Sequence, residues 1–328
     1  MSLRWPFKRS ESTDQLVVSW SEQTLVYVLA QLRPDGTYQV TQSGVEHQGD
    51  DSFENFARRL QGLGLKGRPA QVMLRPVQYQ FLQIEAPSVP PEELRSAARY
   101  QIKDLLEAHV DDVTLDVMRV GDGQQQGAGH LFVAAASNDM LKSIIELSDA
   151  MQWSVRVIDI QEASQRNIQL ALVGSEGGRF MADAALVFSD ERQVLLTVSA
   201  NNELYYSRRL ELPAGLFSSA DLSSATPQLS TPRDFDADPL AQRFVTELQR
   251  SLDALRRTWS FIQLEGMRVY AAERSADVST WLGQQLGLRV DTLSVNALFP
   301  GFDGIASAQQ ASCLPLLGVL LRTESRAL

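Results

Sequence analysis

The apolar and polar positions of the first part of the chain follow strand and helix periods in turn. Residues 16–30 and 38–45 are rich in β-branched and apolar side chains, and Pro34, Asp35 and Gly36 between them form a turn sequence. This pattern predicts a β-hairpin. Residues 52–61 carry apolar side chains at helical spacing, and strands are expected at 70–74 and 80–85.

The clearest helix signal follows a proline-rich break at residues 87–91. Pro91 suits the first turn of a helix, and Glu92 and Glu93 suit the positive end of its dipole. The apolar residues that then recur at helical spacing are Leu94, Ala98, Ile102, Leu105 and Leu106. Further along, the pattern predicts strands at 113–120, 130–135 and 154–160 and helices at 139–151 and 161–173.

The second half begins with another predicted hairpin, at residues 185–200 and 203–212, with its turn at Asn201 and Asn202. When Leu16 is aligned with Leu186, seven of fifteen positions in the two hairpins are identical. This similarity indicates an internal duplication, with a chance match between strand-rich segments as the alternative. Beyond it, the pattern predicts a long helix after Asp238 and Pro239, strands at 267–272 and 288–293, and helices at 278–286 and after Ala306.

Composition restricts the possible partners. The chain has 328 residues, 30 basic and 40 acidic, and a formal net charge of -10, which disfavours a nucleic-acid-binding role. The single cysteine, Cys313, lies in an apolar segment, as is typical of a buried thiol in a reducing compartment. No signal peptide is visible, and the apolar stretch at 313–321 is too short to span a bilayer. A cytoplasmic location is therefore expected.

The sequence gives little support for a catalytic or metal-binding motif. The GxGxxG pattern at residues 62–67 ends a predicted helix, whereas a dinucleotide fingerprint opens one, and no P-loop sequence is present. The three histidines, His47, His109 and His130, are far apart, and no nucleophile elbow is found, so neither a metal site nor a hydrolase is expected. Acidic clusters such as Asp111 and Asp112 suit solvated or capping positions.

The N-terminal tail, residues 1–13, mixes cationic and aromatic side chains, and a segment at 213–238 is rich in Ser, Ala, Pro and Asp. The latter composition is typical of a flexible insertion. The tail is typical either of a peripheral membrane anchor or of a frayed terminus. The tail residues in question are Trp5, Phe7, Lys8 and Arg9, together with Arg4.

Two duplicated halves that each open with a hairpin and continue in strand–helix units resemble the actin/Hsp70/sugar-kinase fold. Four segments indicate one family within this fold. They are residues 85–107, the strand with Leu-Asp at 113–117, residues 130–137, and the second strand of the later hairpin with the residues after it, at 204–215. They resemble the PilM family of type IV pilus assembly, and most of all its MshI-like members of mannose-sensitive haemagglutinin (MSHA) pilus biogenesis. The resemblance covers residues 14–322 or so.

The resemblance implies an α/β, actin-like (ribonuclease H-like) fold with a first half at 14–174 and a second at 175–328. A small α+β subdomain at 86–152 would be inserted in the first half. It also implies a scaffold beneath the inner membrane that grips the N-terminal peptide of a bitopic pilus assembly partner, with a homo-oligomer as a further possibility. Tyr100, Ile102 and Leu106 are candidate partner-binding residues because of their place on the inserted helix, with ordinary core packing as the alternative.

Three elements that actin-fold ATPases need for nucleotide depart from the family pattern. Such enzymes place Asp-x-Gly at the tip of the first strand of each half, where the carboxylate orients a metal-bound water and glycine admits phosphate. The first tip has Ser19 and Ser21, the second has Ser189 and Glu191, and the adenosine loop has Ala271 and Ala272 in place of two glycines. The sequence therefore predicts a non-catalytic protein without cofactor or metal.

Two alternatives stay open at this point. The first is a diverged ATPase or sugar kinase of the same fold, which would still bind Mg-ATP. The second is a GspL-like cytoplasmic domain of a type II secretion system, which requires a membrane span after residue 320, whereas the sequence ends at Leu328.

Overall fold

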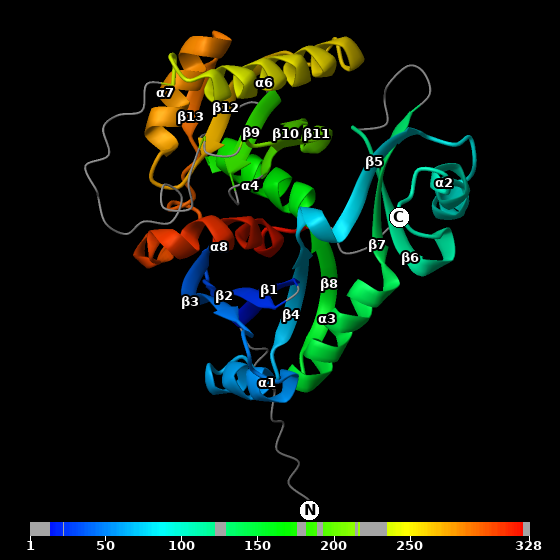
Figure 1. Cartoon of the computed structure of the whole chain (residues 1–328), viewed down its shortest axis with the longest axis vertical. Coiled ribbons are helices and arrows are strands. Elements are labelled where there is room, and N and C mark those ends of the chain that lie inside the picture. Colours follow the sequence, from blue (N-terminus) through cyan, green and yellow to red (C-terminus); the bar gives the residue numbers. More distant parts are fainter. Residues whose placement is uncertain are drawn as a thin grey trace, which may run out of the picture.

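The computed structural model describes residues 14–21, 23–121, 129–175, 182–188, 193–213, 216 and 235–323. Two five-stranded sheets dominate it, and a smaller three-stranded sheet projects from the side of the first (Figure 1). The predicted tail at 1–13 and most of the predicted insertion at 213–238 lie outside the described residues. The α/β fold class expected from the sequence is confirmed.

The first large sheet has the strand order β3-β2-β1-β4-β8. Its single β-rich stretch at 16–30 is in fact two strands, because Ser21 lies opposite Thr24 across a tight turn. The predicted hairpin turn at Arg33 to Gly36 is present between β2 and β3. The further turn between β1 and β2, whose sequence contains neither glycine nor proline, was not predicted. The strand bounds are β1 Asp14–Ser21, β2 Thr24–Leu32, β3 Tyr38–His47, β4 Pro69–Leu74 and β8 Ser154–Ile160.

The second large sheet repeats this topology with the order β11-β10-β9-β12-β13. In both sheets three antiparallel strands are followed by two parallel ones, which confirms the duplication. The predicted turn at Asn201 and Asn202 is present, with φ of 50° and 68°. The strand bounds are β9 Ala182–Phe188, β10 Gln193–Ala200, β11 Glu203–Glu211, β12 Leu264–Tyr270 and β13 Arg289–Thr292.

The offset of 170 residues that aligns Leu16 with Leu186 does not align the second strands of the two hairpins. Leu16 lies opposite Leu29 in the first sheet, whereas Leu186 lies opposite Leu196 in the second. If both strands kept the offset that aligns Leu16 with Leu186, the partner of Leu186 would be Ser199. The chain from Leu186 to its partner is three residues shorter than the chain from Leu16 to its partner, so the identities counted along β10 belong to a shifted register.

Helices cover both sheets and also separate them. α1 and α3 pack on the outer face of the first sheet, and α6 and α7 pack on the outer face of the second. α4 and α8 lie between the sheets, where a shared core joins Val17 of β1, Val187 of β9 and Leu317 of α8 (Figure 1). The bounds are α1 Phe53–Gly62, α3 Asn138–Met151, α4 Gln161–Ser175, α6 Pro239–Thr258, α7 Ser275–Leu286 and α8 Ser307–Leu320.

The inserted subdomain is a three-stranded antiparallel sheet of order β5-β7-β6, covered on one face by α2. Its first strand precedes residue 86, and α3 packs on the first large sheet, so its position differs from the predicted 86–152. The inserted helix stops at Ile102, earlier than the predicted end near Leu106. The bounds are β5 Tyr79–Glu85, α2 Leu94–Ile102, β6 Val113–Arg119 and β7 His130–Ser137.

Candidate functional site

A groove of about 740 Å³ lies between the inserted sheet and the body of the protein. Its apolar floor comes from the face of the inserted sheet that α2 does not cover, where Phe81 of β5 stacks on Phe132 of β7 with ring centroids 4.8 Å apart. Phe132 is buried in the core of the second half, and Phe81 packs against the cores of both halves, so this face of the inserted sheet also contacts the body of the protein. The other floor residues from this sheet are Met118, Ala134 and Ala136.

Two sheet edges face this groove. β6 is the outer strand of the inserted sheet, and all six residues from 114 to 119 line the groove, so the strand presents its backbone as well as its side chains. β8 is the outer strand of the first large sheet and contributes Ile158, Asp159 and Ile160. An outer strand carries unpaired N–H and C=O groups that a further strand can bind.

Charged residues that line the groove form ion pairs across it and beside it. Asp159, buried at the end of β8, accepts from Arg322 at 2.9 Å, and Asp116 on β6 accepts from Arg95 of α2 at 2.8 Å. The groove is therefore amphipathic, because carboxylate and guanidinium groups line it together with apolar side chains.

Tyr79 lines the groove and is buried. Its hydroxyl donates to the Glu162 carboxylate and accepts from the backbone N–H of Gln161 at 3.2 Å. Burial, and next the Glu162 carboxylate, raise the pKa of Tyr79 well above its usual range. Arg209 from β11 completes this cluster with an ion pair to Glu162. Tyr79 is therefore neutral and fixed in position.

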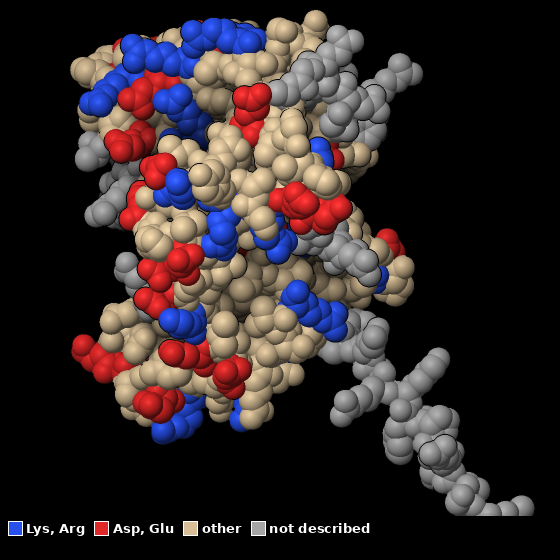
Figure 2. All heavy atoms as spheres, turned by 90° about the vertical axis from the view of Figure 1, so that its right-hand side faces the viewer, with Lys and Arg blue, Asp and Glu red and all other residues tan. Residues whose placement is uncertain are grey.

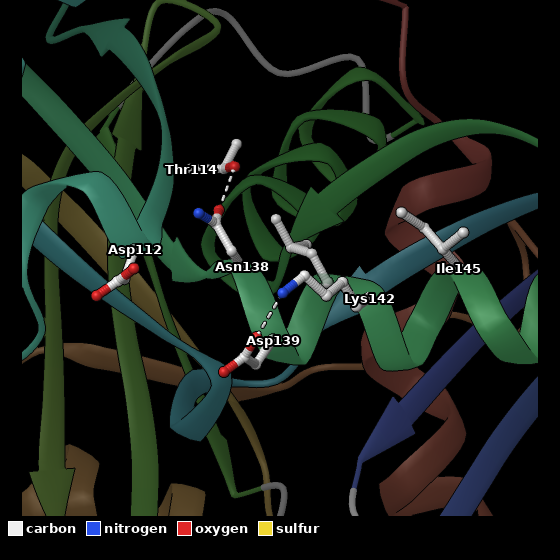
Figure 3. A pocket seen from close by; sticks show the side chains of 7 residues that line it. Asp112, Thr114, Asn138, Asp139, Lys142 and Ile145 are labelled. Atoms are coloured by element: carbon white, nitrogen blue, oxygen red, sulfur yellow. Dashed lines mark hydrogen bonds and ion pairs between the residues drawn. The ribbon is translucent and has the colours of Figure 1, made fainter.

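A second hollow of about 370 Å³ continues from the groove along α3 and shares Thr114 and Leu141 with it (Figure 3). In it Thr114 donates to Asn138 at 2.8 Å, and Lys142 pairs with Asp139 at 2.8 Å. The apolar residue on its far side is Ile145, which is exposed. These bonds hold the polar side chains in place and leave the hollow open. The groove therefore extends along α3 into this second hollow.

The three residues predicted to bind the partner do not lie in the groove. Ile102 is completely buried in the small core between α2 and the inserted sheet, and Leu106 packs against that core, so ordinary core packing accounts for both. Tyr100 is 74% exposed and lies beneath Lys103 on the outer side of α2. The groove residues were missed, although the alternation of Thr114 and Asp116 with apolar residues marked the two faces of β6.

At the first nucleotide-loop position, Ser19 and its neighbour Trp20 form hydrogen bonds with other side chains of the protein. Ser19 is buried, and its Oγ accepts from Arg75 Nε at 3.2 Å. Gln78 donates to the carbonyl oxygen of Trp20 at 2.7 Å, and Trp20 stacks on Phe56. Ser21 ends the strand at the tight turn. Polar side chains of neighbouring segments thus hold the tip of β1.

The third loop position adopts an unusual backbone. Ala272 has a φ of 48°, in the left-handed region that favours glycine, while Ala271 is buried. The Ser275 hydroxyl accepts from Ala271 N–H at 2.9 Å and donates to the Ala272 carbonyl oxygen at 2.7 Å. The backbone bend associated with glycine in this loop is therefore present, although glycine is not.

Other predicted positions lie outside the described residues. They are Ser189 and Glu191 at the second loop and Trp5, Phe7, Lys8 and Arg9 in the tail. Within the part of the chain that the structure describes, no group of His, Cys, Asp or Glu side chains is arranged to hold a metal ion. No described helix is both long and apolar enough to cross a membrane.

Comparison with known proteins gives structural neighbours only. No protein-family model and no curated protein matches the sequence. A chain of the PilM-PilN type IV pilus biogenesis complex matches 95% of this chain and 99% of its own length, with a TM-score of 0.70 and 16% identity. A Bacteroides thetaiotaomicron protein of unknown function with an actin-like ATPase fold matches 97% of this chain and 99% of its own, with a TM-score of 0.51 and 9% identity.

The cytoplasmic domain of EpsL, an inner membrane component of the type II secretion system of Vibrio cholerae, covers less of the chain. It matches 61% of this chain and 71% of its own, with a TM-score of 0.41 and 15% identity. The near-complete overlap with the first neighbour agrees with the resemblance read from the sequence. The chain therefore has the actin-like ATPase fold, in the arrangement that it shares with the PilM-PilN structure.

Proposed function

We propose that this protein is a non-catalytic scaffold of a type IV pilus assembly machine of the MSHA type, and that its groove binds the N-terminal cytoplasmic peptide of a bitopic inner-membrane partner. The observation that carries the proposal is the pair of outer strands, β6 and β8, that face one groove with an apolar floor. The PilM-PilN structure supports it, because a chain with the same fold there belongs to a pilus complex.

The shape of the groove favours an extended peptide. A strand added at the edge of β6 would form main-chain hydrogen bonds, while its alternate side chains would reach the floor around Phe81 and Phe132. The charged groove residues Arg95, Asp116 and Arg322 would select against an entirely apolar segment. A groove of about 740 Å³ is in the range that holds several side chains.

The absence of catalysis is part of the same proposal. A serine held by Arg75 stands where an ATPase requires a metal-orienting carboxylate, and Ala272 stands where it requires glycine. A diverged ATPase or sugar kinase is the alternative. It predicts that Mg-ATP raises the melting temperature of the protein, and the absence of a shift at millimolar nucleotide would exclude it.

Calorimetric titration tests the groove. A synthetic peptide with the N-terminal sequence of the bitopic protein encoded beside this gene is expected to bind with micromolar affinity or better. Ile158→Lys places a charge in the groove at a side chain that is 42% exposed, so the fold should tolerate it while affinity falls at least about tenfold, or ~1.4 kcal/mol.

Val77→Lys is the matched control. Val77 is 75% exposed and does not line the groove, so this change adds the same charge and should leave affinity unchanged. Equal effects of the two substitutions, or no heat of binding with the folded wild-type protein, would refute the groove as the peptide site.

A further inference from the structure

Four arginines form a positively charged patch on α6 and the neighbouring strand β11. Arg243, Arg250 and Arg257 follow one another at intervals of seven residues, close to two helical turns, so they lie on one side of α6. Arg208 of β11 lines the same shallow hollow, of about 270 Å³, as Arg250, and the carboxylates of Glu211 and Glu247 also line it. Figure 2 shows basic atoms gathered along the upper edge of the molecule, where Figure 1 places α6. We call these four residues the arginine patch.

Most of this patch has no counter-ion within the protein. Among the described residues, Arg208, Arg250 and Arg257 form no ion pair and no hydrogen bond, and Arg243 only approaches Glu247 at 3.8 Å. Elsewhere in the described structure arginines are commonly paired, as Arg268 is with Asp183 and Arg289 with Asp291. Unpaired cations gathered on a chain of net charge -10 create a local positive potential that attracts anions.

The composition of the patch argues against a protein partner. The apolar side of α6 is buried against the second sheet, through Phe244, Leu248, Leu252 and Leu255. The exposed positions of the helix are Pro239, Arg243, Thr246, Gln249, Arg250, Asp253, Arg256, Arg257 and Thr258, and apart from Pro239 in the first turn none is apolar. Protein interfaces depend on apolar or aromatic anchors at their centre, whereas a polyanionic surface does not need them.

Length and one neighbouring residue favour a lipid surface over other polyanions. α6 has 20 residues, which span ~30 Å, so its arginine row matches a planar array of head groups. Phe261, four residues beyond Arg257, is 57% exposed. A basic row with an exposed aromatic ring at one end is typical of segments that lie on a bilayer surface.

We propose that the arginine patch binds the phosphate groups of an anionic lipid bilayer. Arginine binds phosphate through two parallel N–H bonds and carries less tightly held water than lysine, which suits contact with head groups. The attraction is electrostatic, because the apolar side of α6 belongs to the core, so binding falls as salt is raised. The proposal does not depend on a peptide in the groove.

Vesicle flotation with the full chain tests this proposal. The wild-type protein is expected to bind vesicles that mix phosphatidylcholine with phosphatidylglycerol, and not vesicles of phosphatidylcholine alone. Each arginine near an anionic surface contributes about fivefold to partitioning, so R208Q/R250Q/R257Q should lower it by about a hundredfold at low salt. Circular dichroism would show that the triple variant is folded.

The matched control removes three exposed cations elsewhere. R58Q/K66Q/K103Q lowers the net charge by the same amount and should bind anionic vesicles as the wild type does. Equal losses in the two triple variants, or no binding of the wild type to anionic vesicles, would overturn the proposal. Binding to poly-glutamate or an oligonucleotide through the patch, with none to vesicles, would overturn it in favour of a macromolecular polyanion.

Discussion

Arg209 of β11 forms an ion pair with Glu162 at the start of α4, with 3.0 Å between Nη2 and Oε1. The Glu162 side chain is completely buried, and that of Arg209 is 26% exposed. Arg209 Nη1 also donates to the carbonyl oxygens of Pro76 and Tyr79, and the guanidinium group lies 4.6 Å from the centre of the Tyr79 ring. One arginine of the second half thus contacts three segments of the first.

Arg209→Met should destabilise the protein by about 3 kcal/mol. The substitution keeps an unbranched apolar stem but leaves the Glu162 carboxylate buried, with only the Tyr79 hydroxyl as a donor on its side chain. An uncompensated buried charge is the costly product of breaking such a pair. Urea unfolding at neutral pH would measure the loss as a lower midpoint at unchanged slope.

The double variant Glu162→Gln/Arg209→Met distinguishes two sources of the lost stability: the unpaired Glu162 charge and the lost contacts of Arg209. Glutamine still accepts from Tyr79 but carries no charge, so the double variant should be more stable than Arg209→Met alone by at least about 1 kcal/mol. Simple additivity of the two single losses would show that the buried carboxylate is not the source of the instability.

Gly318 allows α8 and α4 to approach each other closely between the two sheets. A Cβ at this position would overlap the Ser164 carbonyl oxygen and Oγ, and Asn167 donates to the Gly318 carbonyl oxygen at 3.0 Å. Gly318→Ala should therefore force the helices apart and destabilise the protein by about 3 kcal/mol. Thermal unfolding followed by circular dichroism measures this change.

Gly174→Ala provides the matched substitution in α4. A Cβ there meets no atom within 4 Å, and alanine is the better helix former, so the protein should gain up to about 1 kcal/mol. Opposite signs for the two alanine variants are expected. A stable Gly318→Ala variant would show that the close approach is not required.

Local patterns in the sequence predicted most strands and helices but not how the central helices pack. α4 carries Gln165 and Gln169 on what would be its core side, and both are buried. Gln165 donates to the carbonyl oxygens of Ala185 and Leu195, and Gln169 to that of Asp183. These hydrogen-bond partners come from the other half of the chain. The local pattern of apolar and polar residues therefore gives no sign that Gln165 and Gln169 have hydrogen-bond partners when buried.

The groove was unpredictable for a related reason. Phe81, Phe132 and Ile158 belong to three strands that are distant in sequence, and the groove exists because the inserted sheet stands away from β8. The apolar residues of the inserted helix, where partner binding was predicted, instead pack on the inserted sheet. The altered loop at Ser19 was visible from residue types alone, because it is a change of chemistry at an aligned position.

Cys313 should resist alkylation for as long as the protein is folded. Burial raises the pKa of its thiol to about 12, so the reactive thiolate is absent at pH 8. Iodoacetamide should label the native protein only at the rate of unfolding, and the denatured protein at once; rapid labelling at pH 8 without unfolding would show that the thiol is accessible.

The same shift couples stability to pH. The native state retains the Cys313 proton up to about pH 12, whereas the unfolded chain releases it near its ordinary pKa of about 8.5. The native state therefore binds more protons between these values, and the free energy of unfolding should fall as pH rises through this range. Cys313→Ser should weaken this dependence in urea unfolding measured between pH 8 and pH 10, because serine does not titrate there.

Ala272→Gly should stabilise the protein by up to about 1 kcal/mol. Ala272 has a φ of 48°, which costs an L-residue about that much, and glycine adopts this conformation freely. Ala271→Gly is the control: Ala271 is buried without a positive φ, so glycine there should destabilise. If both glycines destabilised the protein, the bend at Ala272 would not be strained.

The melting temperature of Ala272→Gly with and without Mg-ATP shows whether relief of backbone strain also restores nucleotide binding. Ala272→Gly should melt at the same temperature with and without millimolar Mg-ATP, because one glycine does not supply the carboxylate that Ser19 and Ser21 lack at the tip of β1. Arg75 and Gln78 would still hold that tip through Ser19 and Trp20. A nucleotide-dependent shift would instead show that a single residue at position 272 blocks an otherwise competent site, and would favour the ATPase alternative.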